Sequence, residues 1–150
     1  MELQTMGSED NKAMVLHFVE EVQGKHRLDL VADMLHPDYI DHAQPGGLPP
    51  APGVTDAREA FKRFFRVMLQ AFPDLDVTIE DQIAEGDKVV TRKTFRGTHR
   101  GELWGQPATG KRVSLEVIDI FRVQEGKIIE HWAELDLLAL SRQLGLRFPG

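Results

Sequence analysis

Residues 112–136 read RVSLEVIDIFRVQEGKIIEHWAELD, two alternating segments on either side of one glycine. Apolar residues recur at every second position, which predicts strands over residues 112–123 and 128–136. Gly126 suits a three-residue hairpin loop that ends on a residue with positive φ. The stretch therefore predicts an antiparallel hairpin with one face against a core.

The length of this loop fixes which residues lie opposite one another. A three-residue loop pairs Val123 with Lys127 and, further along, Asp119 with His131. Directly opposed residues share a face, so two ionisable groups meet among apolar ones. The same face then gathers Val113, Leu115, Val117, Phe121, Ile129, Ala133 and Leu135.

A loop one residue shorter or longer gives another arrangement, because a one-residue slip turns every side chain to the other face. Asp119 then faces Glu130 or Trp132, and His131 moves to the face of Ile118. We prefer the first register because it separates apolar residues from charged ones more cleanly.

The opposite face of the hairpin is more apolar than a solvated face should be, because it carries Ile118, Ile120 and Trp132. A helix or a second subunit must cover part of it. We therefore expect a homodimer.

The composition limits the class of protein. A chain of 150 residues with 41% hydrophobic and 28% charged residues is typical of a single globular domain, here residues 1–150. The net charge of −6 argues against nucleic acid or a membrane as partner, and the densest basic group is expected on a solvated face. That group is Arg92, Lys93, Arg96 and Arg100. With no membrane-length apolar run and no export signal at the N-terminus, we expect a cytoplasmic location.

Two helical patterns occupy the first part of the chain. The first ends near Gly24, and the second, over residues 28–35, is stopped by Pro37. Residues 38–54 are expected to be irregular, and their Pro- and Gly-rich part, residues 44–53, is a candidate lid over a site. The first pattern consists of Val15, Phe18, Val19 and Val22.

The clearest helix starts at Asp56, which forms a capping-box pattern with Glu59, and it ends at Pro73. Strand patterns over residues 75–79 and 88–95 follow it, and residues 137–144 suit a short closing helix. Helices followed by antiparallel strands predict an α+β fold. We expect a cone-shaped curved antiparallel sheet with the N-terminal helices packed on its concave face.

Several local motifs accompany this order of elements. They are Pro37-Asp38-Tyr39 with His42, Phe72-Pro73-Asp74-Leu75, Gly97-Thr98-His99, Gly101, Trp104-Gly105, Pro107, Thr109-Gly110, Ile118-Asp119-Ile120 and Glu130-His131-Trp132. Over nearly the whole chain they resemble the SnoaL-like polyketide cyclases of the nuclear-transport-factor-2-like superfamily. The resemblance implies the cone fold of that superfamily.

The resemblance also implies an activity, the closure of a polyketide ring by an intramolecular aldol reaction without a cofactor. The superfamily fold hosts dehydratases, isomerases, epoxide hydrolases and binding modules as well. In the cyclases the acid/base aspartate falls two residues after the His, where this chain has Ala133. A cyclase mechanism here would need another proton carrier.

Asp119 and His131 are the candidate catalytic residues. A carboxylate can orient an imidazole and leave its second nitrogen ready to exchange a proton near neutral pH. The alternative is a buried polar pair that only satisfies its own hydrogen bonds. Burial would raise the pKa of Asp119 and an imidazolium would lower it, so the sequence leaves the direction open.

Other residues are candidates for binding a substrate. His36, Tyr39 and His42 follow the second helix, where they could reach a carbonyl or hydroxyl of a ligand, and Trp104 could pack against an apolar one. Among the aromatic residues of the helices, Phe18 and Phe65 are the candidates to line the cavity, although such stripes are more often core. The spacing of the histidines matches no compact zinc pattern, so we expect no metal.

We therefore expect a cofactor-independent acid/base enzyme that acts on a small hydrophobic or polyketide-like molecule. A non-catalytic small-molecule binding domain is the first alternative, suggested by Ala133. A lyase, isomerase or hydrolase of the same fold is the second.

Overall fold

The computed structural model describes residues 7–43 and 56–145 of the chain. Its helices are α1 (Ser8–Phe18), α2 (Val31–Met34), α3 (Ala57–Ala71) and α4 (Leu137–Gln143), with a π-helical segment Val19–Gly24 and a 3₁₀ turn Leu28–Leu30. Its strands are β1 (Leu35–Asp41), β2 (Asp76–Glu85), β3 (Lys88–Thr98), β4 (Arg112–Gln124) and β5 (Lys127–Leu135).

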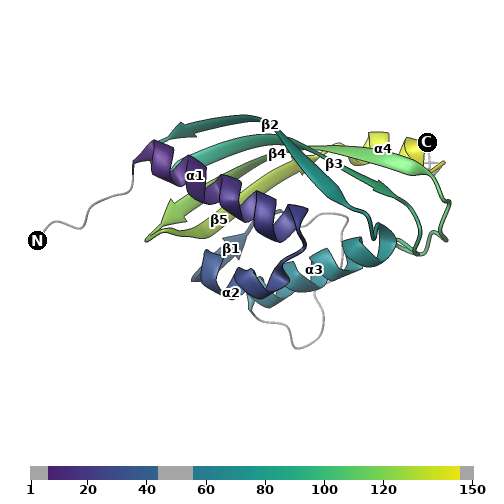
Figure 1. Ribbon diagram of the computed structural model, residues 1–150, viewed down its shortest axis with the longest axis horizontal. Helices are drawn as coiled ribbons and strands as arrows, with labels where there is room; N and C mark the ends of the chain where they lie inside the picture. Colours follow the sequence, from purple (N-terminus) through teal and green to yellow (C-terminus); the bar gives the residue numbers. More distant parts are fainter. Residues whose placement is uncertain (1–6, 44–55, 146–150) are drawn as a thin grey trace, which may run out of the picture.

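The strands form one curved sheet in the order β1-β5-β4-β3-β2. Neighbouring strands are antiparallel except β1, which runs parallel to β5. Helices α1 and α3 lie on the same side of the sheet, and α4 follows β5 at its far end (Figure 1). This arrangement confirms the expected α+β fold, a curved sheet with helices packed on one face.

The edge strand β1 corrects one expectation, because residues 38–41 belong to it and are not irregular. Its pairs with β5 include Leu35 with Ile128 and Asp41 with His131. Pro37 has no N–H to donate, but an edge strand tolerates it where no partner needs that hydrogen. The candidate lid, residues 44–53, lies outside the described residues.

The register of the β4–β5 hairpin also differs from the expected one. The turn has two residues, Glu125 and Gly126, both with positive φ (55° and 73°), and an extra residue bulges from β5 between the pairs Val123–Ile128 and Arg122–Glu130. The shorter turn and the bulge each shift the pairing by one residue. Their sum is two, so beyond the bulge every predicted face is kept although the partners change. Before the bulge the shift is one residue, so Ile128, and not Lys127, lies opposite Val123.

As a result, Asp119 lies opposite Ala133, and His131 lies opposite Phe121. The prediction that Asp119 pairs directly with His131 is therefore wrong. The prediction that both side chains share one face is confirmed, because they meet on the diagonal of the ladder.

Helix α3 is held at both ends by polar contacts. The Asp56 carboxylate accepts a hydrogen bond from the Arg58 N–H at 2.9 Å, as expected for an N-cap. At the other end, the N–H groups of Arg100 and Gly101 donate to the Ala71 carbonyl at 2.9 and 3.2 Å. The loop after β3 is thereby fixed against the end of the helix.

The core lies between the sheet and the helices. Phe18 of α1 packs against Phe61 of α3 and Phe121 of β4, with ring centroids 5.7 and 6.0 Å apart. We call this side of the sheet the helix-covered face. The other side, the outer face, exposes Ile40, Ile83 and Ile118, which are 50%, 65% and 51% accessible. Within the described residues, no helix is long and apolar enough to cross a membrane.

Candidate active site

Asp119 lies in the middle of β4, on the helix-covered face, and it is 2% exposed. Its Oδ2 atom is 2.7 Å from Nζ of Lys93 and 3.3 Å from Nε2 of His131. Its Oδ1 atom accepts a hydrogen bond from the Thr91 hydroxyl. Strand pairing explains this geometry, because Thr91 lies opposite Asp119 and Lys93 is the next residue of β3 on the same face.

His131 has a carboxylate on each side of its ring. Nε2 faces Asp119, and Nδ1 lies 3.1 Å from Oδ1 of Asp41 on the edge strand. The flat face of the ring stacks on Phe121 at 4.7 Å, with an interplanar angle of 20°. Ionised carboxylates only accept hydrogen bonds, so a carboxylate beside each ring nitrogen favours the imidazolium, which donates from both.

The charges of this cluster shift the pKa values of its members. Burial would raise the pKa of Asp119, but the Lys93 ammonium and then His131 outweigh it and lower that pKa to about 2. Burial would lower the pKa of His131, but the hydrogen bonds to Asp119 and Asp41 outweigh it and raise that pKa above its ordinary value. Both shifts favour the charged forms, a carboxylate on Asp119 and an imidazolium on His131.

Tyr39 and Asp41 extend the cluster toward the edge of the sheet. The Tyr39 hydroxyl donates to Oδ2 of Asp41 at 2.7 Å, and the N–H of Ala43 donates to Oδ1 at 2.9 Å. Burial and then the negative charge of Asp41 raise the pKa of Tyr39 well above its ordinary value. The phenol therefore stays protonated and acts as a donor.

Lys93 corrects the expectation of a solvated basic face, because its side chain is 1% exposed. Besides Asp119, its ammonium group contacts Oε1 of Gln23 at 2.8 Å, and it lies 5.3 Å from the ring centroids of Phe95 and Phe121. Gln23 belongs to the π-helical segment after α1. An ammonium group this deeply buried is stable only because these groups surround it.

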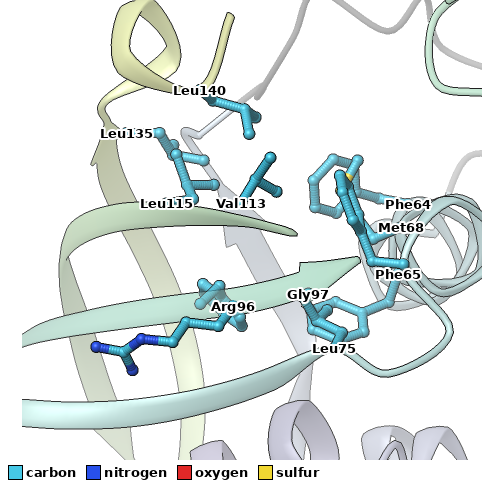
Figure 2. Close-up of a pocket in the computed structure, with 12 residues that line it drawn as sticks. Phe64, Phe65, Met68, Leu75, Arg96, Gly97, Val113, Leu115, Leu135 and Leu140 are labelled. Carbon is cyan, nitrogen blue, oxygen red and sulfur yellow. The ribbon is translucent and has the colours of Figure 1, made fainter. Parts of the chain in front are cut away.

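An apolar pocket opens beside the cluster, on the helix-covered face. Its cavity volume is about 70 Å³. Figure 2 shows Phe64, Phe65 and Met68 of α3 on one side, facing Val113, Leu115, Leu135 and Leu140 on the other. In the same view the Arg96 guanidinium points away from the pocket, so the lining is apolar.

The pocket and the cluster are neighbours along the strands. Lining residue Phe95 is two positions from Lys93, and lining residue Leu135 is two positions from Ala133, which lies opposite Asp119. Ala133 is partly exposed even though it belongs to the helix-covered face.

The structure places the predicted binding residues in different regions. Phe65 lines the pocket, and Tyr39 joins the cluster through Asp41. Phe18 does not reach the pocket, because it packs in the core between α3 and β4.

His36, His42 and Trp104 lie away from the pocket. His36 is at the start of β1, where its ring accepts the Asp38 N–H at 3.0 Å. His42 stacks on Trp132 at 4.9 Å and bonds Glu130, so it belongs to the outer face. Trp104 is 41% exposed in the turn after β3 and has a positive φ of 49°.

Sequence reasoning missed four members of the cluster: Asp41, Thr91, Lys93 and Gln23. The alternation of Thr91, Lys93 and Phe95 along β3 is the signal that could have found two of them, because it places them on one face. In the described ranges, no group of three or more His, Asp or Glu side chains is arranged so that it could hold a metal ion.

A curved sheet, helices on one face and a buried cluster of charged side chains beside an apolar pocket define a small cone-shaped α+β domain. Residues 13–144 match the family model described as SnoaL-like polyketide cyclase, so the chain belongs to this family. The resemblance inferred from the sequence motifs is thereby confirmed.

Several characterised proteins are similar to this chain. Aklanonic acid methyl ester cyclase DnrD of Streptomyces peucetius is 34% identical over 130 residues, which cover 86% of this chain and 87% of the relative. Nogalonic acid methyl ester cyclase of Streptomyces nogalater is 32% identical over 124 residues, 82% of this chain and 89% of the relative. The solved structure of TsrD from Streptomyces laurentii has a TM-score of 0.79 and 33% identity, covering 95% of this chain and all of TsrD.

Proposed function

We propose that the protein is a cofactor-independent cyclase that closes a ring in a small hydrophobic, polyketide-like substrate by an intramolecular aldol reaction. The observation that carries the proposal is the pair of opposite proton carriers, Asp119 and His131, beside an apolar pocket. The names of the similar cyclases support a polyketide methyl ester as the substrate class.

The proposed chemistry needs only proton transfers. Asp119 removes a proton from a carbon next to a carbonyl, and the resulting enolate attacks a second carbonyl of the same molecule. His131 then gives its Nε2 proton to the new alkoxide. In the substrate one C–H bond and one carbonyl π bond break, and one C–C and one O–H bond form. On the protein an O–H bond forms on Asp119 and the Nε2–H bond of His131 breaks, so the atoms balance without a co-reactant.

Lys93 has a positioning role in this proposal. Its ammonium group keeps the neighbouring carboxylate ionised in a place where burial alone would favour the neutral acid. It also places a positive charge close to the developing enolate, where a low dielectric strengthens the attraction.

The alanine at position 133 fits this scheme. By the resemblance to the cyclases it stands where they would carry their acid/base aspartate, and it lies directly opposite Asp119. Opposed residues have Cβ atoms about 5 Å apart. A carboxylate on β4 can therefore reach the same part of the site as a carboxylate on β5 does in the cyclases. Asp119 is thus the proposed replacement for the missing group.

The test is conversion of aklanonic acid methyl ester by the purified protein and by three variants, each checked for folding by circular dichroism. Asp119→Asn is expected to lower turnover by at least about 100-fold. The double variant Asp119→Ala/Ala133→Asp, which moves the carboxylate across the strand pair, is expected to recover part of it. Glu116→Gln, an exposed change on the same strand, is the matched control. A folded Asp119→Asn variant with unchanged turnover would contradict the proposal.

A non-catalytic binding domain is the alternative that one observation favours, since Asp119 is 2% exposed and its oxygens already have partners. Saturable binding of the ester, measured by fluorescence or calorimetry, without any product would support it. Products from epoxides, enols or hydroxyketones, but not from the ester, would instead support a lyase, isomerase or hydrolase.

A homodimer and a cytoplasmic location complete the proposal. The exposed isoleucines of the outer face support the dimer, since a second copy would remove them from water. The location follows from the sequence-based expectation alone, and cell fractionation tests it.

A further inference from the structure

We propose that Asp41 is the outer member of a proton relay, in which His131 passes protons between the buried Asp119 and solvent at the edge strand of the sheet. This inference rests on the proposed function and extends it to a residue that the sequence did not suggest. It is carried by the contacts of His131, by a gradient of exposure and by the hydrogen bonds of Asp41.

Both nitrogens of the His131 ring are held by contacts to carboxylates. In the parallel pair of β1 and β5, Asp41 lies beside His131, and the N–H of His42 donates to the His131 carbonyl at 2.8 Å. This fixes the backbones, so Oδ1 of Asp41 stays 3.1 Å from Nδ1 while Nε2 remains 3.3 Å from Asp119. An imidazole held at both nitrogens can accept a proton at one and release a proton from the other.

The exposure of the three side chains rises along this line. The side chain of Asp119 is 2% exposed, that of His131 is 10% and that of Asp41 is 24%. Asp119 itself has no route to water through its other partners, because Thr91 and Lys93 are buried as well. Asp41 is therefore the member of the described cluster through which a proton can reach solvent.

The hydrogen bonds of Asp41 suit it to this task. Tyr39 and Ala43 donate to it, so its carboxylate keeps its position when the proton on His131 moves. The transfer begins after His131 has given its Nε2 proton to the alkoxide, which leaves a neutral ring with a free Nε2. The O–H bond of Asp119 then breaks and a new Nε2–H bond forms, while the Nδ1–H bond breaks and an O–H bond forms on Asp41. Asp41 loses this proton to water, and the imidazolium is restored when a proton from solvent returns to Nδ1 through Asp41.

The groups that act on His131 can all be named among the described residues. They are Asp41 and Tyr39 from β1, Asp119 from β4, and Lys93 from β3 through its contact with Asp119. A test must therefore separate the effect of Asp41 from that of the buried pair.

The first measurement needs no substrate. The ring nitrogens of His131 are titrated by ¹⁵N NMR in the wild type, in Asp41→Asn and in Asp38→Asn, a matched loss of an exposed carboxylate on the same strand. Asp41→Asn keeps the shape and the hydrogen-bond acceptor but not the charge, and it should lower the pKa of His131 by about one unit. Asp38→Asn should leave it unchanged. Equal titration curves for the wild type and Asp41→Asn would overturn the relay, whatever the protein does with a substrate.

The second measurement separates proton transfer from a static role. Turnover of aklanonic acid methyl ester is measured in Asp41→Ala with increasing formate, a small acid that can occupy the vacated space. A relay predicts a loss of at least 10-fold that formate restores in proportion to its concentration. A loss that formate does not restore would overturn the relay and leave Asp41 as a purely structural residue. If the wild type converts nothing, the proposed function fails, and the NMR titration still decides whether His131 and Asp41 share a proton.

Discussion

Nζ of Lys93 lies 2.7 Å from Oδ2 of Asp119, and neither side chain is more than 2% exposed. A buried ion pair adds little net stability, because desolvation of both charges offsets their attraction. Removing one partner is different, since it leaves an uncompensated charge in the core. This asymmetry makes the pair a sensitive test of how the site is built.

Lys93→Met should lower the free energy of unfolding by about 3 kcal/mol, because the Asp119 carboxylate would lose its cation. Urea unfolding followed by fluorescence measures the change. The matched control is Asp81→Asn, which breaks the Arg92–Asp81 pair on the same stretch of β3. That pair has the same 2.7 Å contact but is 52% and 59% exposed, so solvent screens it and its loss should lower stability far less than Lys93→Met does. Similar losses in both variants would show that the burial of Lys93 does not matter.

The same pair predicts how stability depends on acid. The folded protein holds the Asp119 proton with a pKa of about 2, whereas the ordinary value is 3.8. Protonation therefore favours the unfolded chain, and a contribution of about 2 kcal/mol, complete well above pH 3.8, is lost as the pH falls to about 2. The midpoint of urea unfolding should therefore fall with pH between about 4 and 2 in the wild type. This acid limb should be shallower in the double variant Lys93→Met/Asp119→Leu. An identical acid limb in the double variant would contradict the lowered pKa of Asp119.

His131 should act in the opposite direction. Its folded pKa is raised above the ordinary 6.5, so its contribution is complete below pH 6.5 and is lost as the pH rises through the folded value. Stability should therefore decline from slightly acidic to alkaline pH, and His131→Gln should flatten that decline. The midpoint of urea unfolding between pH 6 and pH 9 gives the measurement. An equal decline in the variant would mean that other groups cause it.

The hairpin shows which parts of the fold follow from sequence. Alternation placed Asp119 and His131 on one face, and the structure agrees. Their direct pairing was wrong, because Glu125 adopts a positive φ in a two-residue turn, and such turns more often carry Asn or Asp at that position. The bulge in the following strand cannot be recognised from the sequence KIIEH of residues 127–131.

Lys93 and Asp41 show why only some residues of the candidate site could be predicted from the sequence. In β3, both Arg92 and Lys93 read as surface residues, and only the partners on β4 and on the π-helical segment decide that Lys93 is buried. Asp41 lies in a segment after Pro37 that the sequence analysis predicted to be irregular. The burial of Lys93 and the strand position of Asp41 are determined by long-range contacts, which a local sequence pattern does not encode.

Gly101 offers a test of the contact between the loop after β3 and helix α3. A Cβ atom at this position would lie 2.1 Å from the Gln70 carbonyl oxygen, which is backbone and cannot move freely. Gly101→Ala should lower the free energy of unfolding by about 3 kcal/mol. Gly86→Ala is the control, because its Cβ meets open space and only its positive φ of 61° is unfavourable, at a cost of about 1 kcal/mol. Thermal unfolding of both variants compares them, and a milder loss at Gly101 would exclude the close contact.

The outer face leads to a prediction about assembly. Ile118 is 51% exposed in the middle of β4, with the half-buried Ile120 and Trp132 on the same face. A homodimer through this face would bury all three, so the wild type should have about twice the chain mass of 17.0 kDa by light scattering at micromolar concentration. Ile118→Lys should reduce it to the monomer, because the buried ammonium would have no partner. Ala13→Lys, on the exposed side of α1, should remain dimeric. A monomeric wild type would show that these isoleucines stay in contact with water.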